Sequence, residues 1–153
     1  MWNDLKALLF ASWETRRADT HSEADVKLAA AALLVEIMGA DFAADPVERA
    51  AIRALLIERF ALPAPDADAL LATAEEEVRR SVSLYPAVQL VNERMGREEK
   101  ARLVGCLWDV AYADGRVDKY EDAAIRKIAE LLYVDHGDFI RMKHRAAERR
   151  FGG

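Results

Sequence analysis

The sequence predicts an all-α fold, in the form of one compact helical bundle with about eight helices. Of the 153 residues, 52% are hydrophobic, with many alanines and almost no threonine. Alanine favours helix, whereas threonine and the other β-branched residues favour strand. Apolar residues also recur at intervals of three and four along most of the chain, which places them on one face of a helix. Because no low-complexity linker interrupts this pattern, we expect residues 1–153 to form a single domain.

Five of the helices are predicted before Gly96. Residues 1–20 form an N-terminal segment that contains a short amphipathic helix, Trp2–Trp13. Ser22 to about Gly39 carries apolar residues on one face, so we expect a helix with one buried face there. Asp45 and Pro46 supply an N-cap and a first-turn proline for the third helix. The fourth and fifth helices are marked by Leu70, Ala74 and Val78, and by Val88, Val91 and Met95.

Three further helices are predicted after Gly96, a residue type that favours helix ends. Each of them has apolar residues three or four positions apart, as a helix with one buried face requires. These apolar positions are Leu103, Leu107, Val110 and Ala111; Ile125, Ile128 and Leu132; and Phe139, Met142 and Ala146.

Charge, cysteine content and the length of apolar runs indicate which cellular compartment and which partners to expect for this protein. The net charge of -5 argues against nucleic-acid binding, which usually needs a basic face. The single cysteine, Cys106, excludes an intrachain disulfide framework, and a reducing compartment is the simplest assumption. The longest apolar run, Leu28–Val35, is shorter than the roughly 20 residues that span a bilayer. Met1–Asp4 lacks the positive charge of a secretion leader, so we expect a cytoplasmic protein without membrane insertion.

An internal repeat relates the two halves of the chain. A shift of 73 positions aligns Ala40–Glu48 with Ala113–Glu121, and the agreement continues from Ala50–Arg53 to Ala123–Arg126. Each copy lies between two predicted helices, so we expect two helix-loop-helix units related by a pseudo-twofold axis. These units span about residues 22–82 and 97–150.

The second copy carries the motif A-D-G-x-hydrophobic-D-x-x-E at Ala113–Glu121, followed by an apolar helix. In this motif the chain resembles the TerB-like family, which is named for a tellurite-resistance protein and occurs also in the N-terminal part of a membrane-anchored DnaJ-type co-chaperone. The resemblance extends from about Leu28 to Ile140. It implies an all-α fold with internal pseudosymmetry, a role near stress or metal-ion response, and acidic residues that bind metal. The first copy departs from the family pattern at Phe42 and Ala44, where glycine and a larger apolar residue are usual.

The acidic residues of the two copies are the candidate metal ligands. Asp114, Asp118 and Glu121 offer the carboxylate oxygens that Ca²⁺ or Mg²⁺ prefers. Gly115 would let the chain turn tightly between them, although the spacing is not that of an EF-hand loop. The second, weaker set consists of Asp41, Asp45 and Glu48.

Helix capping is the alternative role for four of these six residues. Asp118 with Glu121, and Asp45 with Glu48, both have the spacing of a capping box, in which the first residue caps and the fourth bonds back. Asp41 and Asp114 are different, because each should follow the C-terminal end of a helix, where a carboxylate is unfavourable by about 0.3–1 kcal/mol. The occurrence of an aspartate at this position in both copies favours a functional role. The alternative is that the N-terminus of the next helix compensates each charge.

Three classes of function follow from these features. The first is a helical module that binds or senses a divalent cation, in a role related to stress or tellurite resistance. The second is a protein-interaction or scaffold domain whose acidic residues cap helices and contact a partner. An enzyme is third, and we expect none, because the sequence contains no complete catalytic signature. We expect a protein partner, and the apolar face of Trp2–Trp13 would pack on the bundle or form a homodimer contact.

Overall fold

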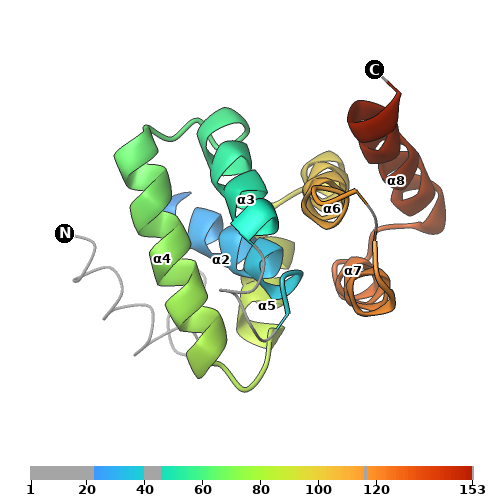
Figure 1. Cartoon of the computed structure of the whole chain (residues 1–153). Coiled ribbons are helices and arrows are strands. Elements are labelled where there is room, and N and C mark those ends of the chain that lie inside the picture. The colour runs from blue at the N-terminus through green and yellow to red at the C-terminus, as the bar shows by residue number, and fades with distance from the viewer. Residues whose placement is uncertain (1–22, 40–45, 116, 153) are drawn as a thin grey trace.

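The computed structural model describes residues 23–39, 46–115 and 117–152, and these residues form seven helices and no strand (Figure 1). The all-α prediction is therefore confirmed, and each helix predicted after Ser22 has its counterpart. The predicted helix Trp2–Trp13 and the predicted N-cap Asp45 lie outside the described residues. The helices are α2 (Glu23–Glu36), α3 (Pro46–Glu58), α4 (Ala64–Arg80), α5 (Tyr85–Arg94), α6 (Arg97–Ala111), α7 (Lys119–Leu131) and α8 (His136–Phe151).

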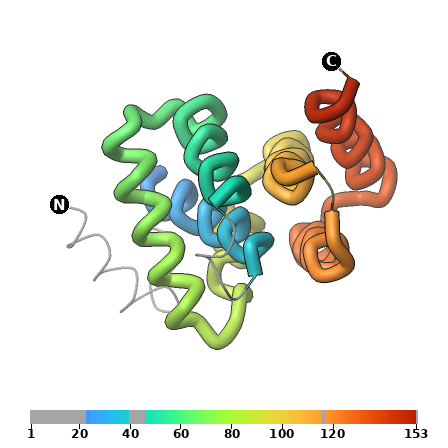
Figure 2. Tube along the Cα trace, in the orientation of Figure 1, coloured from blue at the N-terminus to red at the C-terminus, as the bar shows by residue number. Residues whose placement is uncertain are grey.

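Helix α2 forms the centre of the first half of the fold. Every residue of Leu28–Val35 is buried, including four consecutive alanines. The helix contacts α3, α4, α5 and α6, and Figure 2 shows it crossing behind α3 and α4. The sequence predicted one buried face, but α2 is buried on all sides because other helices surround it. Alanine makes this possible, since its small side chain lets neighbouring helices approach closely.

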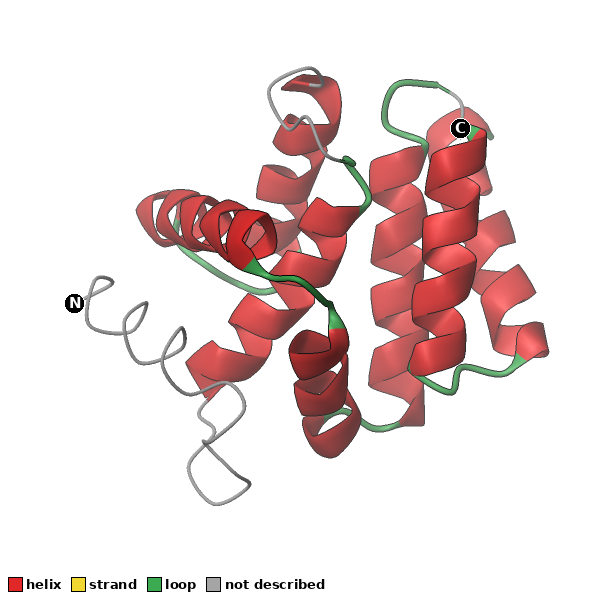
Figure 3. Cartoon of the chain, turned by 90° about the horizontal axis from the view of Figure 1, so that it is seen from below, coloured by secondary structure: helices red, strands yellow, loops and turns green. Residues whose placement is uncertain are grey.

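Helix α6 joins this first group to the last two helices. It contacts α2 and α3 on one side and α7 and α8 on the other. Figure 3 shows α6, α7 and α8 standing beside the group formed by α2–α5. Trp108 of α6 is completely buried, and Phe139 of α8 packs edge-on against it with ring centroids 5.5 Å apart. No helix in the described part of the chain combines the length and apolar character needed to cross a membrane.

The enclosure of α2 can be tested by enlarging one of its alanines. We expect Ala30→Leu, at a completely buried position, to lower the free energy of unfolding by about 1–3 kcal/mol, because added methyl groups overpack a dense core. The matched control is Ala72→Leu, at an exposed position of α4, which should change stability little. Urea denaturation followed by far-UV circular dichroism measures both variants. If the two variants were equally stable, there would be free space beside Ala30 of α2.

Candidate functional site

The acidic motif of the second copy begins helix α7. Asp118 is the N-cap, and its Oδ1 accepts a hydrogen bond of 2.8 Å from the backbone N–H of Glu121. Glu121 Oε1 accepts one of 3.1 Å from the backbone N–H of Asp118. These two bonds form the predicted capping box and satisfy two N–H groups at the helix start. Gly115 has a φ of +105°, so the tight turn predicted at this glycine uses a left-handed backbone conformation.

Glu121 also contacts the equivalent glutamate of the first copy. Its carboxyl group lies within hydrogen-bonding reach of that of Glu48, which lies in the first turn of α3. Both side chains are buried, with Glu48 1% and Glu121 5% exposed. A carboxylate only accepts hydrogen bonds, so a bond between two carboxyl groups requires that one of them holds a proton. The first turns of α3 and α7 meet at these two carboxyl groups, and we call this contact the glutamate pair.

Burial is the main reason why the pKa of Glu121 lies above its ordinary value. The hydrogen bonds to Glu48 and to the backbone of Asp118 lower this pKa, whereas the negative charges of Asp118 and Asp114 raise it further. Because desolvation is the largest cause, burial works against the charged form of Glu121.

The other candidate metal ligands differ in how they relate to the glutamate pair. Asp114 is exposed, and its charge acts on Glu121, so the two lie within electrostatic reach of one another. Asp118 is occupied as a helix cap. Asp41 and Asp45 lie outside the described residues. Within the ranges that the structure describes, no group of three or more histidine, cysteine, aspartate or glutamate side chains has metal-binding geometry.

Sequence analysis did not connect Glu36 with Tyr120. The hydroxyl group of Tyr120 in α7 donates a hydrogen bond of 3.3 Å to Glu36 Oε2 at the end of α2. The ring of Tyr120 also lies close to Gly39, whose φ of +84° turns the chain after α2. Burial raises the pKa of Glu36, and the Tyr120 hydroxyl partly offsets this. The two partners are 84 residues apart, so no local spacing pattern could have signalled the contact.

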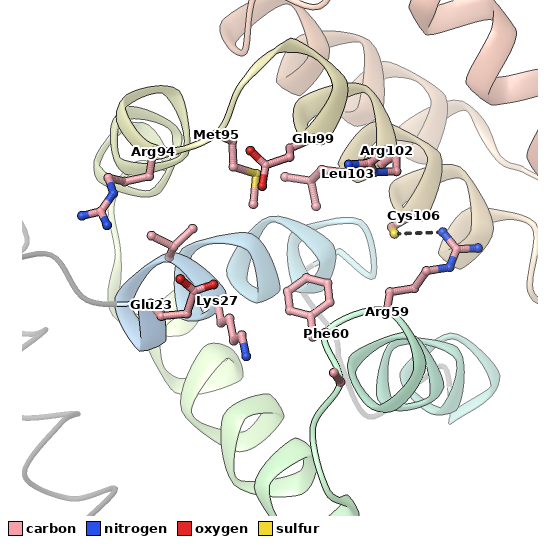
Figure 4. A pocket seen from close by; sticks show the side chains of 12 residues that line it. Glu23, Lys27, Arg59, Phe60, Arg94, Met95, Glu99, Arg102, Leu103 and Cys106 are labelled. Carbon is pink, nitrogen blue, oxygen red and sulfur yellow. Dashed lines mark hydrogen bonds between the residues drawn. The ribbon is translucent and has the colours of Figure 1, made fainter.

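A cavity of about 440 Å³ lies away from the acidic motif, between α2, α6 and the ends of α3 and α5. Figure 4 shows Phe60, Met95 and Leu103 around it, and Arg59 bonded to the sulfur of Cys106 at 3.6 Å. Arg59 also bonds Asp109, at 3.4 Å. Burial raises the pKa of the Cys106 thiol to about 11, so it stays protonated at neutral pH and is a poor nucleophile. The cavity therefore offers no activated nucleophile at this cysteine.

The capping role of Asp118 predicts a specific loss of stability. We expect Asp118→Ala to lower the free energy of unfolding by about 0.5–2 kcal/mol, because the N–H of Glu121 loses its acceptor. Asp118→Ser keeps a capping oxygen and should retain most of the stability. Thermal and urea denaturation compare the two variants with the wild type. If the alanine variant were as stable as the serine variant, the capping role of Asp118 would be contradicted.

The glutamate pair predicts a pH dependence of stability. Since the pKa of Glu121 is raised, the folded state holds a proton that the unfolded state has lost, and stability falls as pH rises from about 4.5 through the raised pKa. The amide of Glu48→Gln can donate to Glu121 without a shared proton. We therefore expect this variant to lose less stability than the wild type as the pH rises above about 4.5.

The control for this experiment is Glu130→Gln, at an exposed position of the same helix α7. Urea denaturation at a series of pH values gives the unfolding free energy of all three proteins. The control should follow the wild-type curve. If Glu48→Gln followed it as well, the pair would hold no shared proton.

Comparison with known protein families supports the resemblance seen in the motif. Residues 27–144 match the family described as Tellurite resistance protein TerB, so the match covers most of the chain, from α2 into α8. No curated protein and no solved structure shows a significant match to the chain. The matched range includes both acidic segments, the glutamate pair and all of α3 to α7. From its motif, its all-helical fold and this match over residues 27–144, the chain belongs to the TerB family.

Proposed function

We propose that this TerB-family protein is a non-enzymatic module that binds a divalent cation at the junction of α3 and α7. The observation that supports the proposal is the contact between Glu48 and Glu121, because it brings one acidic residue of each copy together. A divalent cation would take the place that a proton would otherwise hold between the two carboxyl groups. Burial makes two negative charges there unfavourable, and a bound cation relieves this as a proton does.

The remaining ligands come from the adjacent acidic residues. Asp114 already acts electrostatically on Glu121, whereas Asp118 is the N-cap of α7. Asp41 and Asp45 are the proposed ligands from the first copy, with Asp118 in a supporting role as cap. Oxygen ligands of this kind suit Ca²⁺ or Mg²⁺ better than the softer metals. The cellular role that we propose is a cytoplasmic one in stress response, including the tellurite resistance for which the family is named.

A thermal denaturation series tests the proposal. Chelator-treated protein is titrated with Ca²⁺, Mg²⁺, Mn²⁺ and Zn²⁺, and a site present only in the folded state should raise stability by about 2.7 kcal/mol at a hundredfold excess over Kd. We expect Asp114→Asn and Glu121→Gln to lose this rise. Glutamine at position 121 can still serve in a capping box, so the second variant separates cation binding from helix capping.

Glu130→Gln is the control and should respond to cations as the wild type does, because Glu130 lies on the exposed side of α7. Calorimetric titration in two buffers with different ionisation enthalpies adds a second readout. If the cation replaces the shared proton, binding releases a proton, and the apparent binding enthalpy differs between the buffers. Absence of any stabilisation by millimolar cations would contradict the proposal and leave the glutamate pair as a structural contact.

A further inference from the structure

The cavity between α2, α6 and the ends of α3 and α5 has an apolar interior. Val26 of α2, Phe60 after α3, Met95 after α5 and Leu103 of α6 line it. Its volume of about 440 Å³ lies within the range of ligand pockets in proteins. A pocket lined by apolar side chains with a few polar groups is the usual form of a small-molecule site.

The lining carries more positive than negative charge, although the whole chain has a net charge of -5. Its described residues include four basic and two acidic side chains, Lys27, Arg59, Arg94 and Arg102 against Glu23 and Glu99. Figure 4 shows the two acidic side chains at the end of the cavity near Met95. Arg59 and Arg102 lie at the other end, toward Cys106. The cavity is therefore basic at its Cys106 end.

Two arginines share one carboxylate at this basic end. Arg149 of α8 donates three hydrogen bonds to Asp109, of 2.9, 3.1 and 3.2 Å. Arg59 reaches the same carboxylate only at 3.4 Å, which is longer than an ordinary hydrogen bond, and its other contact is the weakly accepting sulfur of Cys106. Two positive charges against one leave one positive charge in excess. Arg59 can therefore turn to an anion in the cavity while Arg149 still pairs with Asp109.

A carboxylate on an apolar chain matches both parts of the cavity. The N–H groups of a guanidinium fit the two oxygens of a carboxylate, so Arg59 can bind it with two hydrogen bonds. Arg102 lies one turn before Cys106 on α6, so its exposed side chain is on the same face of the helix and supplies a second positive charge. The apolar chain would then extend over Leu103 toward Phe60 and Met95.

We propose that this cavity binds a fatty acid, with its carboxylate at Arg59 and Arg102 and its hydrocarbon chain against Phe60, Met95 and Leu103. The single negative charge of the ligand offsets the excess positive charge beside Asp109. The opposite orientation would place the carboxylate near the acidic side chains at the Met95 end, where like charges repel. The site is independent of the proposed cation site, since none of the six candidate metal ligands is among its described lining residues.

Calorimetric titration of the full chain with decanoate tests the proposal. We expect saturable binding below the critical micelle concentration, and octanoate should bind about tenfold more weakly because it buries fewer methylene groups. Methionine methyl signals in NMR spectra locate the site. Decanoate should shift the signal of Met95, which lines the cavity, and leave that of Met142 unchanged, because Met142 packs against Gly105 and is not part of the lining.

The contribution of charge is tested with variants. Arg59→Gln should weaken decanoate binding at least tenfold and leave unchanged the binding of decanol, which has no charge. Arg102→Gln alters an exposed side chain, so it should leave the fold intact and weaken decanoate binding severalfold. The control is Arg145→Gln, which changes an exposed arginine of α8 outside the lining and should bind as the wild type does.

Three results would overturn the proposal. The first is the absence of saturable decanoate binding, and the second is unchanged binding by Arg59→Gln. The third is a shift of the Met142 signal in place of the Met95 signal, because this would put the fatty acid at another part of the protein. Thermal denaturation of each variant checks that a loss of binding is not a loss of the fold.

Discussion

Enclosure of helix α2 by four other helices is the constraint on which the rest of the structure depends. A helix that is apolar on all sides can be stable only when it is buried on all sides. The residues from Leu28 to Val35 meet this condition because α3, α4, α5 and α6 surround them. The position of α2 in turn fixes Glu36 and Gly39 at its end, where Tyr120 of α7 reaches them. This contact holds the first turn of α7 against the end of α2.

The buried carboxylates show two different solutions to the same electrostatic problem. Glu75 is neutralised by Arg49 through two hydrogen bonds, of 2.8 and 3.0 Å. Asp138 accepts hydrogen bonds from Arg141 and Arg97, which lower its pKa. The carboxyl group of Glu121 instead meets another carboxyl group, and its pKa is raised. Contact with arginine favours the charged form of a buried carboxyl group, whereas burial beside another carboxyl group favours the protonated form.

The first turn of helix α7 carries a buried and an exposed contact side by side. Glu121 is buried near Glu48, whereas its neighbour Tyr120 is half exposed and bonds Glu36. Successive residues of a helix point in directions about 100° apart, so a single turn can serve a buried site and an exposed surface. The helix begins at a capping box, and this holds the first turn, and with it both side chains, in a defined position.

The sequence by itself determined the helical class, the order of the helices and the capping box at Asp118, because these features depend on residues three or four positions apart. The motif at Ala113–Glu121 also identified the family. Only the tertiary structure decided that α2 is enclosed on all sides, that Glu121 meets Glu48, and that Tyr120 bonds Glu36. These contacts join residues far apart in the chain, and no local spacing specifies them. They arise when helices pack, since packing decides which faces meet and which charges become buried.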